Sequence, residues 1–244
     1  SLKVPGNNAV NYKLHPDKLE NSYFDYEWRS DNKLPITVFH KVEERDSCMR
    51  LTVQLTAAQG VYFNYRQLLS TGYRHDNCQF YMPGFWYRRN LRSPKKAPSF
   101  HTSDSWLVRE DRLSAPLTGI FSEKEKRFMT VNRLDDFSMD ALATHKEGEI
   151  ILSGKTSLGF TGFENQQGIA MLSFGFPYRE APKSYIRKLT LAPEVEAFQL
   201  MKKGESVLLT WEIMESGADD FSDFIQHTWE HCYDTYVPKP VENS

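Results

Sequence analysis

The stretch Ser206-Val-Leu-Leu-Thr-Trp-Glu-Ile213 carries the pattern that decides the fold. Apolar side chains at 207, 209, 211 and 213 alternate with a second set at 206, 208, 210 and 212, and a period of two is typical of a half-buried β-strand. The stretch Arg50–Thr56 repeats the pattern, with Leu51, Val53 and Leu55 as its apolar members. Just before the first stretch, Lys202-Lys-Gly-Glu205 is typical of a tight turn between two strands.

Outward from these two segments, the chain contains further strand-like runs separated by glycine or proline clusters. The runs are 23–28, 35–43, 117–121, 126–133, 148–153, 168–175, 185–191 and 195–201. Roughly ten strands with few helices indicate a sandwich or barrel, not alternating β/α units. We therefore expect an all-β fold, a large antiparallel β-sandwich.

Two segments break the β pattern. Residues 64–72 predict a short helical turn that ends at Gly72. Residues 218–236 predict an amphipathic C-terminal helix, because apolar side chains recur there at three-four spacing. These side chains are Phe221, Phe224, Ile225, Thr228, Trp229, Cys232, Tyr233 and Tyr236. Pro238 and Pro240 then end the helix and begin a stiff exit of the kind found in linkers.

The bulk properties of the 244 residues exclude several classes of function. A net charge of −2 gives no reason to expect nucleic acid or a membrane surface as partner, and no apolar run approaches the ~18 residues of a membrane span. The three cysteines, Cys48, Cys78 and Cys232, show neither disulfide nor zinc spacing, so each is expected to be a small buried hydrophobe. His227 and His231 lie four residues apart, but without a third ligand nearby we expect no metal and no cofactor.

Residues 79–112 form the segment whose composition points most clearly to binding. Pro83, Gly84, Pro94 and Pro98 predict a loop, and loops on a rigid scaffold often carry function. Aromatic faces stack on sugar rings, hydroxyls take charge-assisted hydrogen bonds, and an arginine fork suits the carboxylate of an acidic sugar. The partner expected from this composition is an oligo- or polysaccharide. The predicted sugar-binding residues are Trp86, Tyr87, Arg88, Arg89, His101, Trp106, Arg109, Asp111 and Arg112.

A structural interpretation of the same residues stands beside this one. Phe80, Phe85 and Trp86 could pack the segment onto a sheet, and residues 109–112 (Arg-Glu-Asp-Arg) could satisfy one another as an ion-pair network. The chain also contains no G-x-S-x-G elbow, no H-E-x-x-H motif, no phosphate-binding glycine loop and no EF-hand. No catalytic residue can therefore be named.

The runs Tyr81–Arg88 and Arg109–Gly119, together with the final helix and its proline exit, resemble the N-terminal domain of certain bacterial glycoside hydrolases. In those enzymes a β-sandwich, a supersandwich similar to the galactose mutarotase fold, precedes an (α/α)₆ barrel. The resemblance implies a sandwich domain over 1–216 and a helix with linker over 217–244. It also implies a downstream helical catalytic domain in the same chain and a periplasmic or extracellular location. Because that helical domain generally carries the catalytic carboxylates, no catalytic residue transfers to this chain.

Three functions follow as hypotheses. The first is a non-catalytic domain of a polysaccharide-degrading enzyme, which supports the catalytic domain and contributes a loop to the substrate. The second is a stand-alone carbohydrate-binding module that uses Trp86, Tyr87 and Trp106 as a stacking platform. The third is an aldose epimerase of mutarotase type, which needs an acid and a base across a sugar ring. His75, His101, Glu110 and Asp111 are the residues that could supply that pair.

Overall fold

The computed structural model describes residues 1–3, 9–13, 26–29, 34–91, 98–135, 148–187 and 190–237. These residues form seventeen strands, two 3₁₀ turns and one α-helix, which confirms the all-β prediction with a single closing helix. The strands are β1 (Leu2–Lys3), β2 (Tyr26–Arg29), β3 (Ile36–Glu44), β4 (Met49–Ala57), β5 (Val61–Phe63), β6 (Tyr65–Arg74), β7 (Cys78–Met82), β8 (Trp86–Arg88), β9 (Trp106–Arg109), β10 (Leu117–Ser122), β11 (Arg127–Arg133), β12 (Gly148–Ile151), β13 (Phe160–Gln166), β14 (Ile169–Phe176), β15 (Arg179–Arg187), β16 (Thr190–Met201) and β17 (Ser206–Gly217). The 3₁₀ turns span His75–Asn77 and Glu110–Arg112, and the helix is α1 (Phe221–Tyr236).

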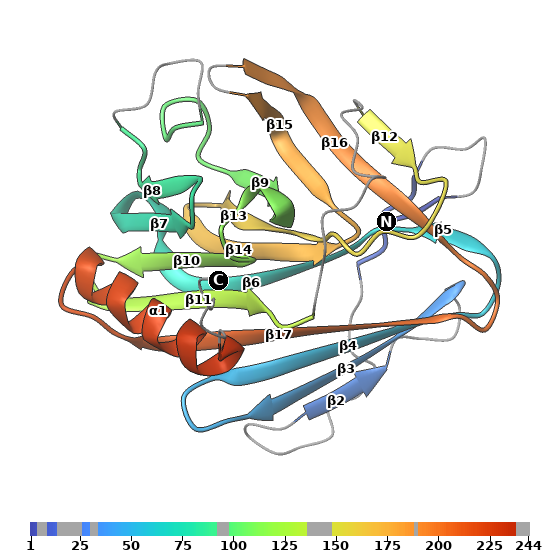
Figure 1. Cartoon of the computed structure of the whole chain (residues 1–244), viewed down its shortest axis with the longest axis horizontal. Helices are drawn as coiled ribbons and strands as arrows, with labels where there is room; N and C mark the ends of the chain where they lie inside the picture. The colour runs from blue at the N-terminus through green and yellow to red at the C-terminus, as the bar shows by residue number, and fades with distance from the viewer. Residues whose placement is uncertain are drawn as a thin grey trace, which may run out of the picture.

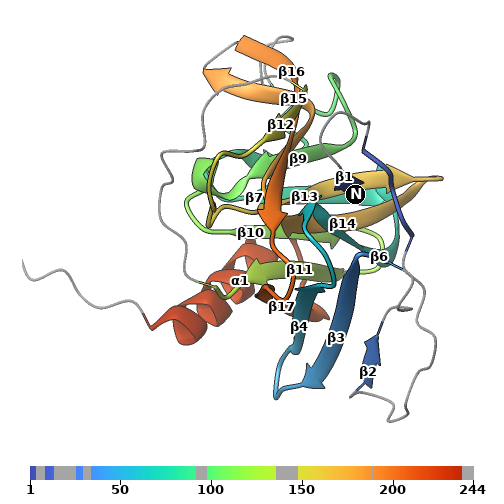
Figure 2. The ribbon, with the colours of Figure 1, turned by 90° about the vertical axis from the view of Figure 1, so that its right-hand side faces the viewer.

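The strands form two sheets that pack face to face (Figures 1 and 2). The nine-stranded sheet has the order β1-β5-β16-β15-β9-β13-β14-β6, with β12 added parallel to β16. The eight-stranded sheet has the order β2-β3-β4-β17-β11-β10-β7-β8 and is antiparallel throughout. The main core contains residues from both sheets, as expected for a sandwich.

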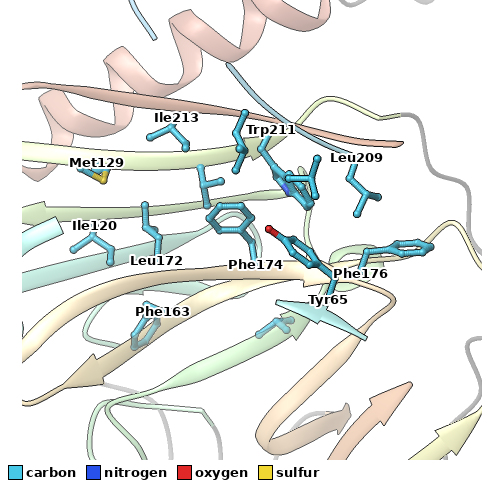
Figure 3. Packing of buried hydrophobic residues seen from close by; sticks show 14 of the residues in the cluster. Tyr65, Ile120, Met129, Phe163, Leu172, Phe174, Phe176, Leu209, Trp211 and Ile213 are labelled. Carbon is cyan, nitrogen blue, oxygen red and sulfur yellow. The ribbon is translucent and has the colours of Figure 1, made fainter. Parts of the chain in front are cut away.

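The sequence stretch 206–213 lies at the centre of the eight-stranded sheet, where β17 pairs with both β4 and β11. Its inward side chains enter the core as predicted, and Trp211 packs against Phe174 of the opposite sheet with ring centroids 5.1 Å apart (Figure 3). The predicted turn after β16 is also confirmed, because Glu205 N–H donates to the Lys202 carbonyl at 3.0 Å. The alternation therefore identified both the strand and its buried face.

The helix α1 covers the outer face of the eight-stranded sheet (Figure 1). Asp220 caps it by accepting the backbone N–H groups of Ser222 and Asp223 at 2.7 and 3.0 Å. Phe224 reaches so close to β10 that a Cβ on Gly119 would lie 2.6 Å from its ring. The helix and the sheet share a second apolar cluster, formed by Tyr81, Leu117, Phe121, Phe128, Met214, Ala218, Phe221, Phe224 and Cys232. Within the described ranges, no helix combines the length and apolarity that a membrane crossing requires.

Three local predictions need correction or completion. The helical turn expected at 64–72 is wrong: residues 65–72 belong to β6, which pairs with β14 with one register shift, and Gly72 adopts a positive φ of 74° at that irregularity. The segment 79–112 is not a continuous loop, because it contains β7, β8 and β9. The run 185–191 is not one strand, since β15 ends and β16 begins inside it. Residues 23–25 and the prolines at 238 and 240 lie outside the described residues.

Candidate functional site

The two tryptophans of the predicted sugar platform are buried. Trp86 and Trp106 are 0% and 1% exposed, and their rings lie 6.0 Å apart in the main core. The indole N–H of Trp86 donates to the Arg88 carbonyl at 2.9 Å, so its polar atom is satisfied locally. They face inward because β8 and β9 belong to the two packed sheets. The proposed stacking platform of Trp86, Tyr87 and Trp106 is therefore wrong for its two tryptophans.

The charged residues that follow are largely committed to one another. Nε and Nη2 of Arg109 each donate to a different carboxylate oxygen of Asp111 at 2.7 Å. Arg112 pairs with Glu180, and Nη1 of Arg133 donates to the fully buried Glu110 at 2.6 Å. The ion-pair interpretation of residues 109–112 therefore holds within the run only for Arg109 and Asp111, because Glu110 and Arg112 pair with residues outside it.

Arg89 and His101 do not join a common site. Arg89 donates from Nε to the Cys78 carbonyl at 3.1 Å and lies over the ring of Phe100. His101 is exposed, whereas His75 is buried between aromatic rings with Nε2 2.7 Å from the Asp104 carbonyl. Of the four residues named for an epimerase acid–base pair, His101 is exposed, whereas His75, Glu110 and Asp111 are each hydrogen-bonded to another protein group.

Tyr87 and Arg88 are neighbouring predicted residues that reach the surface, as His101 also does. Tyr87 is 52% exposed, and its ring packs against Tyr81 at a centroid distance of 5.4 Å. Arg88 has a positive φ of 55°, an uncommon backbone conformation for a residue with a side chain. Its guanidinium lies 5.0 Å from the ring centroid of Phe221, at the start of α1. Strand β8 therefore faces the helix N-terminus at this point.

A hollow of about 390 Å³ lies at this junction. Its lining combines polar, charged and aromatic groups: Gln79, Arg88, Phe121, Glu123, Lys126, Asp220 and Phe221. Gln79 donates to Glu123, and Lys126 donates to the Asp219 carbonyl at 2.6 Å. Among the described residues, Arg88 makes a cation–π contact with Phe221 and no ion pair, so the N–H groups of its guanidinium remain for a ligand.

The charge of Asp220 in this hollow has a clear physical origin. Hydrogen bonds from the Asp223 and Ser222 N–H groups lower the pKa of the Asp220 carboxyl, and Lys126 and Arg88 lower it further. The carboxylate is therefore held ionised by the helix start, where negative charge is favoured. The Asp220 carboxylate is therefore a hydrogen-bond acceptor that lies near the cationic side chains of Lys126 and Arg88.

A second hollow of about 510 Å³ runs along the exposed side of α1 and is lined by Gln226, Trp229, Glu230, Tyr233 and Asp234. Trp229 is 40% and Tyr233 is 64% exposed. The indole N–H of Trp229 donates to the Tyr81 hydroxyl at 2.8 Å, and Tyr81 also contacts Tyr87. The buried Tyr81 thus contacts one residue of each lining, Trp229 and Phe221. We call the linings of both hollows together with Tyr87 the aromatic surface.

Sequence reasoning missed the helical half of this surface. The apolar stripe of the helix was expected to face the sheet, but only Phe221, Phe224, Thr228 and Cys232 are buried. The sequence carried no clear signal for it, because eight apolar or aromatic positions in a helix of 16 residues are about the number that one buried face takes.

A separate polar cluster lies on the nine-stranded sheet and contains Arg66, Glu164, Arg179 and Glu196. Arg66 pairs with Glu164 and donates from Nε to Ser173 at 3.2 Å, while Arg179 lies 4.0 Å from Glu196. Burial lowers the pKa of Arg66, which Glu164 opposes and Arg179 reinforces. Glu164 Oε1, Arg179 Nε and Glu196 Oε1 are buried and have no hydrogen-bond partner among the described residues. Buried polar atoms of this kind call for water or a ligand.

Among the described residues, the structure also assembles a group of possible metal ligands, against the expectation of no metal spacing. Cys48, Glu212 and His231 bring one ligand atom each within 4.8 Å of one another. Sequence spacing could not reveal them, because they come from the β3–β4 turn, from β17 and from α1.

Comparison with known proteins gives fold similarities only. No protein-family model matches the chain, and no curated protein matches it. Among solved structures, the chain is similar to the polysaccharide lyase BACCELL_00875, with 12% identity, a TM-score of 0.41 and coverage of 93% of this chain and 26% of that one. It is also similar to a galactose mutarotase related enzyme from Lactobacillus acidophilus, with 12% identity, a TM-score of 0.41 and coverage of 86% and 73%.

The galactosidase domain of the α-galactosidase-sucrose kinase AgaSK is a third similar structure, with 10% identity, a TM-score of 0.40 and coverage of 85% of this chain and 27% of that chain. The protein Slr1438 from Synechocystis sp. PCC 6803 is a fourth, with 7% identity, a TM-score of 0.38 and coverage of 84% and 66%. The chain thus spans about a quarter of the lyase and galactosidase chains. All of these TM-scores lie below 0.5, so the similarities assign neither a family nor an activity.

Proposed function

We propose that this chain is a carbohydrate-binding β-sandwich domain whose sugar site is the aromatic surface. The observation that carries the proposal is the presence of exposed aromatic rings and an exposed arginine beside two hollows. Tyr87, Trp229 and Tyr233 supply flat apolar faces for sugar rings. Carboxylates and amides at the rims supply hydrogen-bond partners for hydroxyl groups, and such charge-assisted bonds are the strong ones.

The linings of the two hollows carry Glu123, Asp220, Glu230 and Asp234 against Arg88 and Lys126, so the surface as a whole does not favour an anion. The proposed preference for an acidic sugar rests on Arg88, because Glu123 and Asp220 already accept hydrogen bonds from the protein. An arginine presents a bidentate fork to a carboxylate, so a uronate-containing chain should bind better than a neutral one. We extend the proposal to a parent enzyme that degrades polysaccharide outside the cytoplasm, in which a helical domain of the same protein carries the catalysis.

The test is a calorimetric titration of the full chain with oligogalacturonate and with a cello-oligosaccharide of equal length. We expect oligogalacturonate to bind more tightly, and Arg88→Ala to remove that preference while retaining weak binding to both ligands. Tyr233→Ala should weaken both ligands by about 10-fold or more, since stacking on an exposed ring is lost. Leu208→Ala, at a side chain that is 61% exposed on β17, is the matched control. Binding that is unchanged in Arg88→Ala and Tyr233→Ala would refute the site.

An aldose epimerase is the second candidate, and the polar cluster on the nine-stranded sheet favours it. Glu164 and Glu196 are two partly buried carboxylates, each with an unpaired oxygen, and Arg66 and Arg179 lie beside them. Epimerisation needs a proton acceptor and a proton donor across the ring, a role that two carboxyl groups can share. Polarimetry on α-galactose and α-glucose would show faster mutarotation, abolished in Glu164→Gln or Glu196→Gln. A rate equal to buffer alone would remove this candidate without affecting the binding proposal.

A further inference from the structure

The group formed by Cys48, Glu212 and His231 has the composition of a transition-metal site. Thiolate, imidazole and carboxylate are the three ligand types that zinc takes in proteins. The three come from different elements: the turn between β3 and β4, the middle of β17 and the third turn of α1. Their ligand atoms lie within 4.8 Å of one another. In a tetrahedral zinc site, bond lengths of 2.0–2.3 Å place ligand atoms about 3.3–3.8 Å apart, so a modest approach of the side chains is enough.

The carboxylate of this group is oriented by its neighbours. Arg50 donates from Nη2 to Oε1 of Glu212 at 2.7 Å. The second oxygen, Oε2, lies 3.2 Å from Nε2 of His231 and receives a hydrogen bond from the Thr235 hydroxyl, also at 3.2 Å. Partners that fix a ligating carboxylate in this way are a regular feature of metal sites.

The imidazole nitrogen of the group faces the carboxylate. Nε2 of His231 is buried and lies 3.2 Å from Oε2 of Glu212, a spacing that two ligand atoms of one zinc ion can also adopt. Cys48 is half-buried and lies in a turn, where its side chain can adjust. A neutral imidazole, a thiolate and a carboxylate would together balance the two positive charges of a zinc ion, and Arg50 lies outside that set.

We propose that Cys48, Glu212 and His231 bind a zinc ion that ties the β3–β4 turn and α1 to β17. The fourth tetrahedral position is left to water, as in sites with three protein ligands. A metal that binds the native state but not the unfolded chain stabilises the fold by mass action. The site would therefore fasten the helix to the sheet at the end opposite its Asp220 cap.

The direct test is a cobalt titration of the full chain after removal of metal with a chelator. Cobalt(II) substitutes for zinc and reports thiolate ligation through a charge-transfer band in the near ultraviolet. We expect one equivalent of cobalt to produce this band and visible bands typical of tetrahedral coordination. Cys48→Ser should abolish the charge-transfer band, and His231→Ala should weaken binding by 10-fold or more. A wild-type chain without the band, or a band that persists in Cys48→Ser, would overturn the proposal.

Thermal unfolding with zinc provides the second measurement. At about 100 times the dissociation constant, zinc should raise Tm by roughly 5–10 °C in the wild type. The shift should disappear in Cys48→Ser and His231→Ala. His227→Ala, one turn earlier on the same helix, and Cys78→Ala, in the core, are matched controls that should retain it. Loss of the shift in the controls as well as in the ligand variants would count against these three residues.

Discussion

Two regions of the molecule draw similar residue types from one stretch of sequence: the buried arginine network, formed by the pairs Arg109–Asp111, Arg112–Glu180 and Arg133–Glu110, and the aromatic surface. Residues 79–112 supply Arg109, Asp111 and Arg112 to the first and Tyr87 and Arg88 to the second. In the first, each charge meets a protein partner away from water; in the second, the rings and Arg88 face solvent. The difference teaches that composition alone cannot separate recognition from architecture. The two kinds of residue differ in whether their side chains are already paired with other groups of the protein.

The largest expected effect on stability is that of Arg133→Met, which removes one member of the buried Arg133–Glu110 pair. Glu110 is fully buried, and burial raises the pKa of its carboxyl while Arg133 lowers it. Removing one member of a buried pair costs about 3–5 kcal/mol because the other charge stays uncompensated. We expect a fall of that size in the free energy of unfolding, measured by urea titration. The double variant Arg133→Met/Glu110→Leu should recover most of it, and a single variant as stable as wild type would contradict the network's structural role.

The next largest effect concerns a buried histidine of the core. His40 is 4% exposed, its Nε2 lies 2.8 Å from the Tyr65 hydroxyl, and burial lowers its pKa to about 4. The unfolded chain takes up this proton near pH 6.5 and the folded chain only near pH 4, so stability falls as the pH drops between these values. The total loss is about 3 kcal/mol. Urea unfolding at pH 7 and pH 4.5 should show a smaller loss in His40→Gln, and an equal loss would contradict the assignment.

A smaller effect is expected where the helix meets the sheet. A Cβ on Gly119 would lie 2.6 Å from Phe224 and 3.1 Å from the Thr130 methyl group, so Gly119→Ala forces α1 outward. Overpacking of this kind costs about 1–3 kcal/mol. Because α1 carries half of the aromatic surface, sugar binding should weaken together with stability in calorimetry. The Phe224→Leu background, which removes the ring, should reduce the penalty of the alanine.

The smallest effect on stability is expected for substitutions of the exposed rings of the aromatic surface. Tyr87→Ala and Tyr233→Ala remove rings that are 52% and 64% exposed, so each should change the free energy of unfolding by about 0.5 kcal/mol or less. Their effect on sugar binding should be larger than their effect on stability. A variant that loses stability but keeps sugar binding would show that its ring stabilises the fold and does not bind sugar.

The sequence predicted the fold well where local pattern and tertiary environment agree. The alternation at 206–213 is confirmed, and so is the helix, whose Asp220 cap and three-four spacing are local signals. The error at 64–72 has the opposite origin: Gln67, Leu68 and Leu69 favour a helix locally, but pairing with β14 overrides that preference. Strand pairing joins distant residues, and no local window contains it.

The site was less predictable for the same reason. Tyr87 and Arg88 were identified from composition, yet Trp229 and Tyr233 join them only because α1 packs beside β7 and β8. Burial of Trp86 and Trp106 likewise depends on the opposite sheet. The ligand set of Cys48, Glu212 and His231 needs three elements to meet. Each of these is a property of the assembled sandwich.

The close packing of α1 on the sheet also has a practical consequence for how this chain can be handled. Tyr81, Phe121 and Phe128 have their outer faces covered by the helix. A version truncated before residue 218 would present these rings to solvent as one contiguous apolar patch, and large patches of that kind promote aggregation. Proteins expressed for crystallography or binding assays should therefore include the helix, since a chain without it would aggregate before its sugar binding could be measured.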